Sequence, residues 1–289
     1  MNTTFRLERV LSGLVLGSLI VGSSGCGDLV SGANLKPTVH YRPSADSAAV
    51  VKVEAKETEV STETAVTGGV GTLRGKIEFQ GIFTPLAPLY VKGGDVKDSE
   101  VCAAVEAPNQ SILVKDGGLA NGFVYLKKAP KVAGSVPPDA VLVFDQKNCV
   151  FKPHAMTVRV GQNVKILNSD GVAHNTHTYG KKNSPTNDVV AMNNTVGVPL
   201  IYRQAEQEPI SVSCDIHNWM KAYHLPIDHP FAAVSAEDGT FEIKDLPVGK
   251  HEFKVWHEVG QLIEKALIVM INPGDNVIAI KVSGAQLGK

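Results

Sequence analysis

The chain has 289 residues, and with 28 Lys and Arg against 29 Asp and Glu it has no excess of positive charge that would point to a nucleic-acid partner. Aromatic residues are few, whereas glycine (27) and proline (16) are frequent and valine-rich runs recur. This composition is typical of a β-rich globular protein, and the length allows two modest domains plus a tail.

Within residues 1–26, Arg6 and Arg9 precede an apolar run over 10–21 that is short for a bilayer span, and small residues then lead to Cys26. This pattern resembles a bacterial lipoprotein signal. The resemblance implies that Cys26 becomes the lipidated first residue, with plain secretion as the alternative. We therefore expect an exported lipoprotein, periplasmic or on the cell surface, that is attached to a membrane by its lipid.

Residues 27–71 are rich in Ser, Thr, Glu and Ala, lack a sustained period and end in glycines. This composition predicts a flexible tether between the lipid and the folded part. Beyond the tether no stretch has a convincing amphipathic helix longer than a few turns. The sequence therefore predicts an all-β fold.

Strands are expected from residue 72 onward. In TLRGKIEFQG, alternate residues Leu73, Gly75, Ile77 and Phe79 share one face, as in a half-buried strand. Further strands are predicted at 140–144, 156–160 and 164–168. The short VGQN sequence between the last two predicts a hairpin-type connection.

The stretch SCDIHNWM places Cys214, His217 and Met220 at steps of three. A mononuclear electron-transfer copper site uses two imidazoles, a thiolate and a weak axial thioether, so this loop offers three of the four donors. The missing imidazole should come from a distant strand end that packs beside the loop. His174 follows shortly after the predicted strand at 164–168 and fits that position. His177 is the competing candidate for this ligand.

The sequence from FKPHAMTVRVGQNVKILNSDGVAHN to SVSCDIHNWM resembles the blue-copper cupredoxin family, with a loop like that of amicyanin, over roughly residues 138–228. The resemblance implies a Greek-key β-sandwich or barrel that holds one type 1 copper ion. The ligands that it implies are His174, Cys214, His217 and Met220. It also implies that Asn175 hydrogen-bonds to the cysteine loop. A zinc site is the weaker alternative, because Met is a poor zinc ligand and further Cys or His ligands are hard to find.

The four cysteines have separate expected roles. If Cys26 takes lipid and Cys214 takes metal, Cys102 and Cys149 remain, and an oxidising compartment favours one disulfide between them. Two separate buried thiols are the alternative.

The stretch AAVSAEDGTFEIKDLPVGKHEFKVWHE resembles the carboxypeptidase regulatory-like β-sandwich, a mostly structural or docking module, and RGKIEFQG resembles its opening strand. We expect a second small β-sandwich over residues 229–289. Residues 72–137 form an N-terminal β segment that either supplies its first strands, so that the copper domain splits the sandwich, or precedes it in a tandem arrangement. The other histidines of this half are interpreted as surface or core residues and not as a second metal site: His224 on the surface, and His229, His251 and His257 on the surface or in the core.

These patterns predict a membrane-tethered one-electron carrier and not an enzyme, because no nucleophile–base or phosphate-loop motif is present. The expected partner is a redox protein, a cytochrome or an oxidoreductase, that docks on an apolar edge formed by His217 and Trp219. The alternative is a copper-holding or sensing lipoprotein. A copper nitrite reductase ranks last, because it needs a second cupredoxin domain and a three-histidine copper.

Overall fold

The computed structural model describes residues 69–130 and 139–288, which belong to one compact unit spanning Thr62–Lys289. The predicted signal, the lipidation site Cys26 and the tether up to residue 68 lie outside the described residues. Within the described ranges, no helix is both long enough and apolar enough to cross a membrane.

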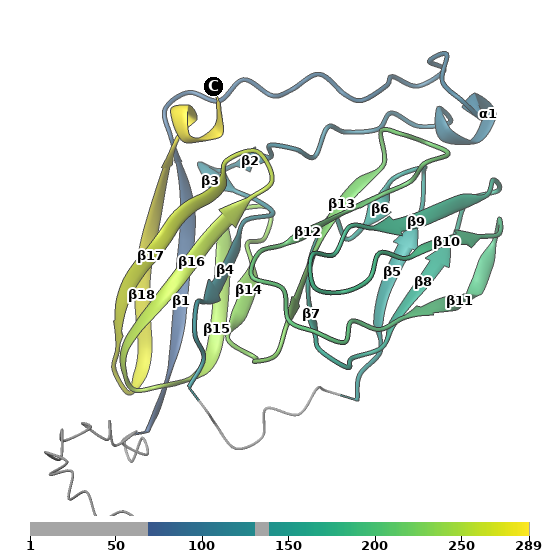
Figure 1. The fold of residues 1–289 in the computed structure, drawn as a ribbon. Coiled ribbons are helices and arrows are strands. Elements are labelled where there is room, and N and C mark those ends of the chain that lie inside the picture. Colours follow the sequence, from purple (N-terminus) through teal and green to yellow (C-terminus); the bar gives the residue numbers. More distant parts are fainter. Residues whose placement is uncertain (1–68, 131–138, 289) are drawn as a thin grey trace, which may run out of the picture. The chain divides into compact units, whose positions relative to one another are not determined.

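The described residues form four β-sheets (Figure 1), which confirms the predicted all-β class. Helical structure in these residues is limited to α1 (Ser99–Cys102) and the 3-10 turn η1 (Gly284–Leu287). The valine-rich runs thus indicated the class correctly, since β-branched residues fit a pleated, half-buried surface.

Two of the sheets are built from the middle of the chain. The first has the order β10-β9-β12-β13-β7, and the second has the order β11-β8-β5-β6. The strands of the first are β7 (Ala155–Arg159), β9 (His174–Thr178), β10 (Asn187–Val190), β12 (Ile210–Ser213) and β13 (Lys221–Ile227). Those of the second are β5 (Leu142–Gln146), β6 (Phe151–Lys152), β8 (Val164–Asn168) and β11 (Asn194–Leu200).

The other two sheets combine strands from both ends of the described chain. One has the order β15-β1-β3-β2 with β18 paired to β1, and the other has the order β14-β4-β16-β17. The early strands are β1 (Val70–Gln80), β2 (Val114–Lys115), β3 (Gly118–Leu119) and β4 (Phe123–Leu126). The late strands are β14 (Ala232–Val234), β15 (Thr240–Pro247), β16 (Gly249–His257), β17 (Gln261–Ile271) and β18 (Gly274–Ser283). Residues before and after the middle sheets therefore share the same hydrogen-bonded ladders.

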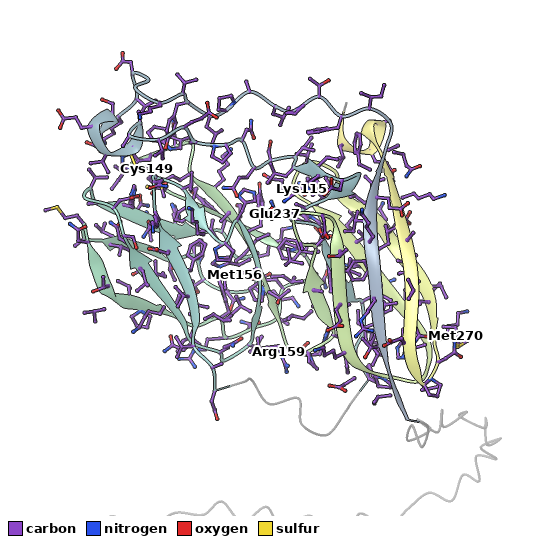
Figure 2. The ribbon with its side chains drawn as sticks, turned by 180° about the vertical axis from the view of Figure 1, so that it is seen from behind. Lys115, Cys149, Met156, Arg159, Glu237 and Met270 are labelled. Carbon is purple, nitrogen blue, oxygen red and sulfur yellow. A yellow bond between two sulfur atoms is a disulfide. The ribbon has the colours of Figure 1, made fainter. Side chains whose placement is uncertain are left out.

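The strand β1 shows why the sequence folds this way. Its alternate residues Leu73, Ile77 and Phe79 are buried, as their period predicts, and β1 pairs antiparallel with β15 and parallel with β18. Gly75 belongs to the same face, but a Cβ there would lie 2.5 Å from the ring of Phe241 on β15. Glycine is needed at this position because the aromatic ring occupies the space of a side chain. Farther along the same sheet, Lys115 pairs with Glu237 at 2.9 Å (Figure 2).

The predicted hairpin at VGQN is wrong. The strands on either side, β7 and β8, do not pair with each other: β7 pairs with β13, and β8 pairs with β5 and β11. Val158 of β7 and Ile166 of β8 are both fully buried in one core cluster, so the short connection carries the chain from one sheet to the other. A sequence pattern that fits a tight turn does not decide whether the two flanking strands pair in one sheet or belong to two sheets that pack against each other.

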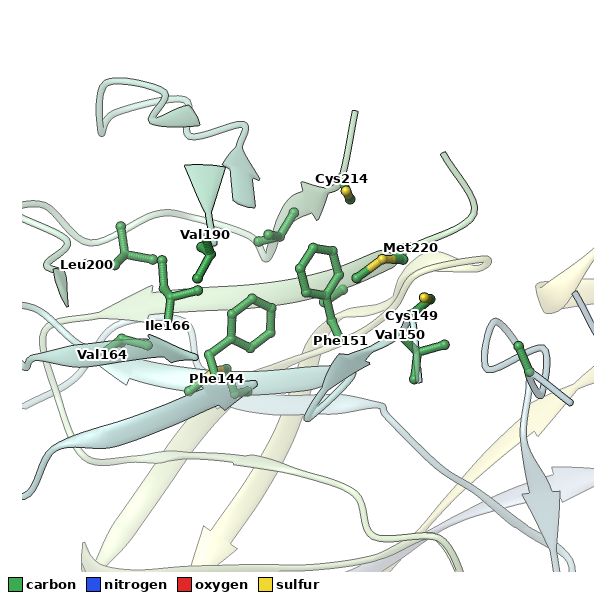
Figure 3. Packing of buried hydrophobic residues seen from close by; sticks show 14 of the residues in the cluster. Phe144, Cys149, Val150, Phe151, Val164, Ile166, Val190, Leu200, Cys214 and Met220 are labelled. Carbon is green, nitrogen blue, oxygen red and sulfur yellow. The ribbon is translucent and has the colours of Figure 1, made fainter. Parts of the chain in front are cut away.

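Buried side chains form one core cluster within the middle sheets and a second within the sheets of β1 and β16. A smaller third cluster joins them, with Phe123, Tyr125 and Trp256 on one side and Leu225 and Ile227 on the other. Figure 3 shows part of the first cluster, where the rings of Phe144 and Phe151 are stacked with centroids 5.0 Å apart.

One long segment links the two sets of sheets. Residues 81–113, called here the cap segment, leave β1, form α1 beside the middle sheets and return to β2 (Figure 1). Cys102 of the cap segment is joined to Cys149 by a disulfide, with the Cα atoms 5.1 Å apart. This confirms the predicted pairing, and the remaining cysteine in the described residues, Cys214, is free and buried.

His224 lies in the core and not on the surface as expected. Its side chain is fully buried on β13, where Nδ1 lies 2.8 Å from the hydroxyl of Tyr202 and the ring packs edge-on against Phe144. Strand alternation placed it there, because Ala222 two positions earlier is also buried. His229 and His257 are buried as well, and neither belongs to a group of potential metal ligands among the described residues.

Candidate metal centre

The turn before β9 brings His174 to its place. Buried Asn168, the last residue of β8, donates from Nδ2 to the carbonyl oxygens of Val172 (2.8 Å) and Val190 (3.1 Å). Its Oδ1 accepts the backbone N–H of Asp170 at 2.9 Å. These bonds hold the connection between β8 and β9 in one shape, so that β9 begins at His174.

The loop between β12 and β13 carries the other three predicted ligands. The N–H of Met220 donates to the carbonyl of His217 at 2.9 Å, and the N–H of Cys214 lies 3.3 Å from the carbonyl of Met220. The thiol sulfur of Cys214 accepts the N–H of His217 at 3.4 Å. The loop is therefore closed on itself, with its three candidate ligands held by backbone hydrogen bonds.

Asn175 joins β9 to this loop, as the sequence predicted. Its Oδ1 accepts the N–H groups of Asp215 (2.8 Å) and Ile216 (3.2 Å), and its Nδ2 donates to the Asp215 carboxylate at 3.1 Å. Its own N–H lies 3.5 Å from the sulfur of Cys214. One buried amide thus fixes the spacing between His174 and the cysteine loop.

Three donor atoms of the predicted ligands converge. The Nδ1 atoms of His174 and His217 lie 2.9 Å apart, and the sulfur of Cys214 lies 3.9 Å from Nδ1 of His217. His174, Cys214 and His217 form a buried group whose ligand atoms all lie within 4.8 Å of one another. Met220 is also buried and belongs to the same core cluster as Cys214 (Figure 3).

Two carboxylates hold the far sides of the imidazoles. Asp170 Oδ2 lies 3.0 Å from Nε2 of His174, and Asp98 Oδ2 lies 2.9 Å from Nε2 of His217. An ionised carboxylate only accepts, so each Nε2 carries a proton and each Nδ1 faces inward, where it presents a lone pair unless it is itself protonated. Two lone pairs at 2.9 Å repel each other unless a cation, a proton or a metal ion, lies beside them.

His177, the competing candidate, is not part of this group. It follows His174 by three positions on β9, and an odd step along a strand directs a side chain to the other face. Its ring is partly exposed, stacks on Tyr179 with centroids 4.2 Å apart and contacts the Asp215 carboxylate at 3.1 Å. The geometry therefore favours His174 as the metal-facing histidine of β9.

The charges in the group favour metal binding. Burial acts to raise the pKa of the Cys214 thiol, but hydrogen bonds with His174 and His217 outweigh it and lower the pKa to about 6. Burial acts to lower the pKa of His174, but its bonds to Asp170 and Cys214 outweigh this, and the pKa lies above its usual value. Cys214 is therefore a thiolate at neutral pH, which is the form that binds metal.

The donor set fits copper. A thiolate and two imidazoles with a nearby thioether form the ligand set of mononuclear electron-transfer copper sites, and thioether sulfur is a soft donor that suits Cu(I). Zinc fits less well, since structural zinc sites are filled by four Cys or His ligands and this group offers three. The residues present thus match a type 1 copper ion.

Two features of the site were missed from the sequence, Asp98 and Asp170. Asp98 lies 119 positions from His217, and no local pattern in the sequence marks it. Asp170 lies four residues before His174, and this short spacing could have identified it as a partner of that histidine. Asp98 also corrects the expected docking edge: His217 is fully buried and Nε2 is bonded to this carboxylate, so the ring presents no free edge.

No protein-family model matches the chain, and no curated protein matches it in sequence. Solved structures do match over about a third of it. A reduced amicyanin variant aligns with 36% of this chain and 98% of its own at 16% identity, with a TM-score of 0.27. A purple cupredoxin from Nitrosopumilus maritimus aligns with 31% of this chain and 100% of its own at 16% identity, with a TM-score of 0.25.

A copper-containing nitrite reductase from Thermus scotoductus also aligns, over 35% of this chain, at 14% identity and with a TM-score of 0.28. The aligned part spans only 25% of the nitrite reductase. Because the TM-scores and identities are low, the metal centre is inferred from the donor atoms described above and not from these likenesses.

Proposed function

We propose that residues 138–228 form a cupredoxin-like domain that binds one type 1 copper ion and carries single electrons. The observation that supports this most directly is the convergence of Nδ1 of His174, Nδ1 of His217 and Sγ of Cys214 within 4.8 Å. Met220, buried at the end of the same loop, would supply the thioether as the fourth donor. Copper bound there would supply a one-electron Cu(II)/Cu(I) couple.

The protein holds these ligands in one geometry. Asn175 fixes the cysteine loop, and Asp170 and Asp98 fix the two imidazole rings. Ligands that are held by surrounding hydrogen bonds change position little when the metal changes its charge. A small rearrangement is what fast one-electron exchange requires.

The burial of the ligands supports a carrier over a catalyst. The side chains of His174 and His217 are fully buried, and those of Cys214 and Met220 are 1% exposed. A catalytic metal keeps an open coordination position for substrate, whereas this set offers four protein donors. A nitrite reductase role is therefore disfavoured.

The setting of the domain is also a proposal. The signal-like residues 1–26 support export and lipidation at Cys26, and the polar stretch between Cys26 and β1 supports a tether, which ends before Val70 because β1 begins there. We further propose that the carrier serves a redox protein, a cytochrome or an oxidoreductase, outside the cytoplasm. The regulatory-like β-sandwich that the sequence predicts would be a docking or structural module.

A copper-holding or sensing lipoprotein is the second candidate. It predicts copper that is labile and colourless, because delivery requires exchange. The complete burial of His217 opposes rapid exchange and so supports the carrier. A colourless complex that loses its copper to a chelator within seconds would favour the second candidate.

The test is an optical spectrum of the oxidised, copper-loaded protein. A type 1 site should give an intense visible band from sulfur-to-copper charge transfer, and Cys214→Ser should abolish it, because a hydroxyl cannot share electrons with Cu(II) as a thiolate does. The neighbouring variant Ser213→Ala should keep the band. A wild-type protein that binds one copper and stays colourless would contradict the electron-carrier proposal.

A further inference from the structure

Asp98 reaches His217 from outside the strands that carry the metal ligands. It lies in the cap segment, and its Oδ2 is 2.9 Å from Nε2 of His217. Its backbone is fixed, since the carbonyl of Asp98 accepts the N–H groups of Val101 (3.0 Å) and Cys102 (2.9 Å). The residue has φ 54° and ψ 41°, a left-handed conformation that aspartate tolerates better than most residues.

The surroundings of His217 are closed by the same segment. Tyr90 of the cap segment packs edge-on against Trp219 with ring centroids 5.3 Å apart, and Trp219 donates from Nε1 to the carbonyl of Cys149 at 3.0 Å. His217 is fully buried, whereas the side chain of Asp98 is 38% exposed. The Asp98 carboxylate therefore lies between His217 and solvent.

The disulfide links this arrangement to the second carboxylate. Cys102 ends the helical turn that starts after Asp98, while the N–H of its partner Cys149 donates to Oδ2 of Asp170 at 2.8 Å. Asp170 in turn holds His174. The N–H of one half-cystine thus bonds the backbone carbonyl of Asp98, and that of the other bonds the carboxylate of Asp170. Both sulfurs lie within 4.8 Å of a ligand nitrogen of His217.

We propose that Asp98 is a positioning residue for the metal centre, and that the cap segment, held by the Cys102–Cys149 disulfide, closes the edge of His217 to solvent and to partner proteins. This rests on the proposed function for the identity of the metal. Asp98 keeps the proton of His217 on Nε2 and directs Nδ1 inward. Its negative charge also makes the imidazole a better donor and stabilises Cu(II) relative to Cu(I).

A consequence concerns electron transfer. With His217 behind the cap segment, an electron would reach a bound copper ion through the cap segment or through another ligand, and not by direct contact of a partner with the imidazole edge. A partner that approaches His217 meets the Asp98 carboxylate first.

The first experiment uses the full copper-free protein and needs no metal. Diethyl pyrocarbonate acylates accessible imidazoles, and mass mapping identifies the modified residue. We expect His217 to be protected in the wild type and in Glu100→Gln, a control on the same helical turn, and to be modified in Asp98→Ala. His177, whose side chain is 25% exposed, should be modified in every variant, and His174, behind Asp170, should stay protected in every variant.

Modification of His174 together with His217 in Asp98→Ala would indicate general unfolding. In that case Asp98→Asn decides, because its amide oxygen still accepts from Nε2 and should keep His217 protected in a folded protein. Modification of His217 in the wild type, or its protection in a folded Asp98→Ala variant, would overturn the proposal that Asp98 and the cap segment close the edge of His217. Neither result depends on whether copper binds.

The second experiment measures copper. Loss of a carboxylate that orients a ligand histidine lowers metal affinity about 10- to 100-fold, which is the loss we expect for Asp98→Ala. Asp98→Asn should keep the affinity closer to that of the wild type but raise the reduction potential, because only the charge is lost. Unchanged affinity in Asp98→Ala together with an unchanged potential in Asp98→Asn would overturn the positioning role. A wild type that binds no copper would instead contradict the proposed function. The acylation result would still decide whether the cap segment closes the edge of His217.

Discussion

The Nδ1 atoms of His174 and His217 face each other at 2.9 Å, although the two residues lie 43 positions apart on different segments. Each ring is fixed from its Nε2 side by an aspartate, so neither can turn away without losing that bond. Two unprotonated Nδ1 atoms at this distance repel each other unless a cation lies beside them. The fold thus holds two imidazoles in the arrangement that a metal ion would stabilise.

The first prediction separates the two histidines of β9. His174→Ala should leave copper loosely held and abolish the visible band, because the cage loses one of its two imidazoles. His177→Ala should change little, since this ring contacts Asp215 and Tyr179 on the other side of the strand. Copper affinity and the optical spectrum measure both effects. The reverse result would mean that His177 is the ligand.

The second prediction concerns Met220. The axial bond of a type 1 site is weak, so Met220→Leu should keep copper bound and coloured, while the reduction potential rises because the polar thioether is replaced by a hydrocarbon. Ile216→Leu, in the same loop, is the matched control and should leave the potential near that of the wild type. Voltammetry of the two variants makes the measurement. Loss of copper from Met220→Leu would show that the sulfur holds the metal more strongly than an axial ligand does.

The sequence predicted well those features that depend on neighbouring residues. The alternation of Leu73, Ile77 and Phe79 located a buried strand face, and the spacing of Cys214 and His217 located two donors that the structure brings together. Local periodicity and local spacing carry this information because the backbone geometry of a strand or a tight loop sets the direction in which each side chain points.

Features that depend on packing between distant segments were not predicted. Asp98 is the main case, since nothing near it distinguishes it from other exposed aspartates until the cap segment meets His217. The wrong hairpin at β7 and β8 has the same cause, because sheet membership is decided by which strands pack and pair across the core. His224 is different: the alternation along β13 indicated a buried position, and only its polarity suggested the surface.

The third prediction concerns the disulfide. The two half-cystines are 47 positions apart, and closing such a loop stabilises the fold by about 4 kcal/mol in the chain-entropy model. The double variant Cys102→Ser with Cys149→Ser should lose roughly this much free energy of unfolding. In urea unfolding of the copper-free protein, a loss well below 1 kcal/mol would show that the unfolded chain gains little freedom when the bond is removed.

The same variant bears on the cap segment. If the disulfide holds Asp98 in place, His217 should become open to acylation in the folded double variant, as in Asp98→Ala. His174 again serves as the internal reference, because its partner Asp170 is attached to the middle sheets through Asn168. Full protection of His217 would mean that the packing of Tyr90 and Trp219 keeps the cap closed without the bond.

The fourth prediction concerns the anchor. If Cys26 carries the lipid, Cys26→Ala should move the protein from the membrane fraction to the soluble fraction of the expressing cell, because the remaining polar tether has no affinity for a bilayer. Ser31→Ala, in the same polar stretch, should remain with the membrane. Membrane-bound Cys26→Ala would indicate that the apolar run over 10–21 is retained as the anchor.

The last prediction concerns pH and His224. Burial lowers the pKa of His224 to about 3, whereas in the unfolded chain it is about 6.5. Between these values the unfolded state binds one more proton than the folded state, so the free energy of unfolding falls as the pH falls below about 6.5. For one group the loss is about 1.4 kcal/mol per pH unit, and above about 6.5 this histidine contributes no pH dependence.

His224→Phe removes the titrating ring but keeps an aromatic side chain against Phe144, so its stability should fall less steeply with acid, by about 1.4 kcal/mol per pH unit relative to the wild type. Tyr202→Phe is the matched control. It removes the hydroxyl that bonds to Nδ1 and lowers the stability at every pH, but it leaves His224 buried, so the steep dependence should persist. Urea unfolding of the three copper-free proteins at pH 7 and at about pH 5 compares the slopes within this window. Equal slopes in the wild type and His224→Phe would mean that His224 takes up its proton without unfolding, through an opening of the core beside Tyr202.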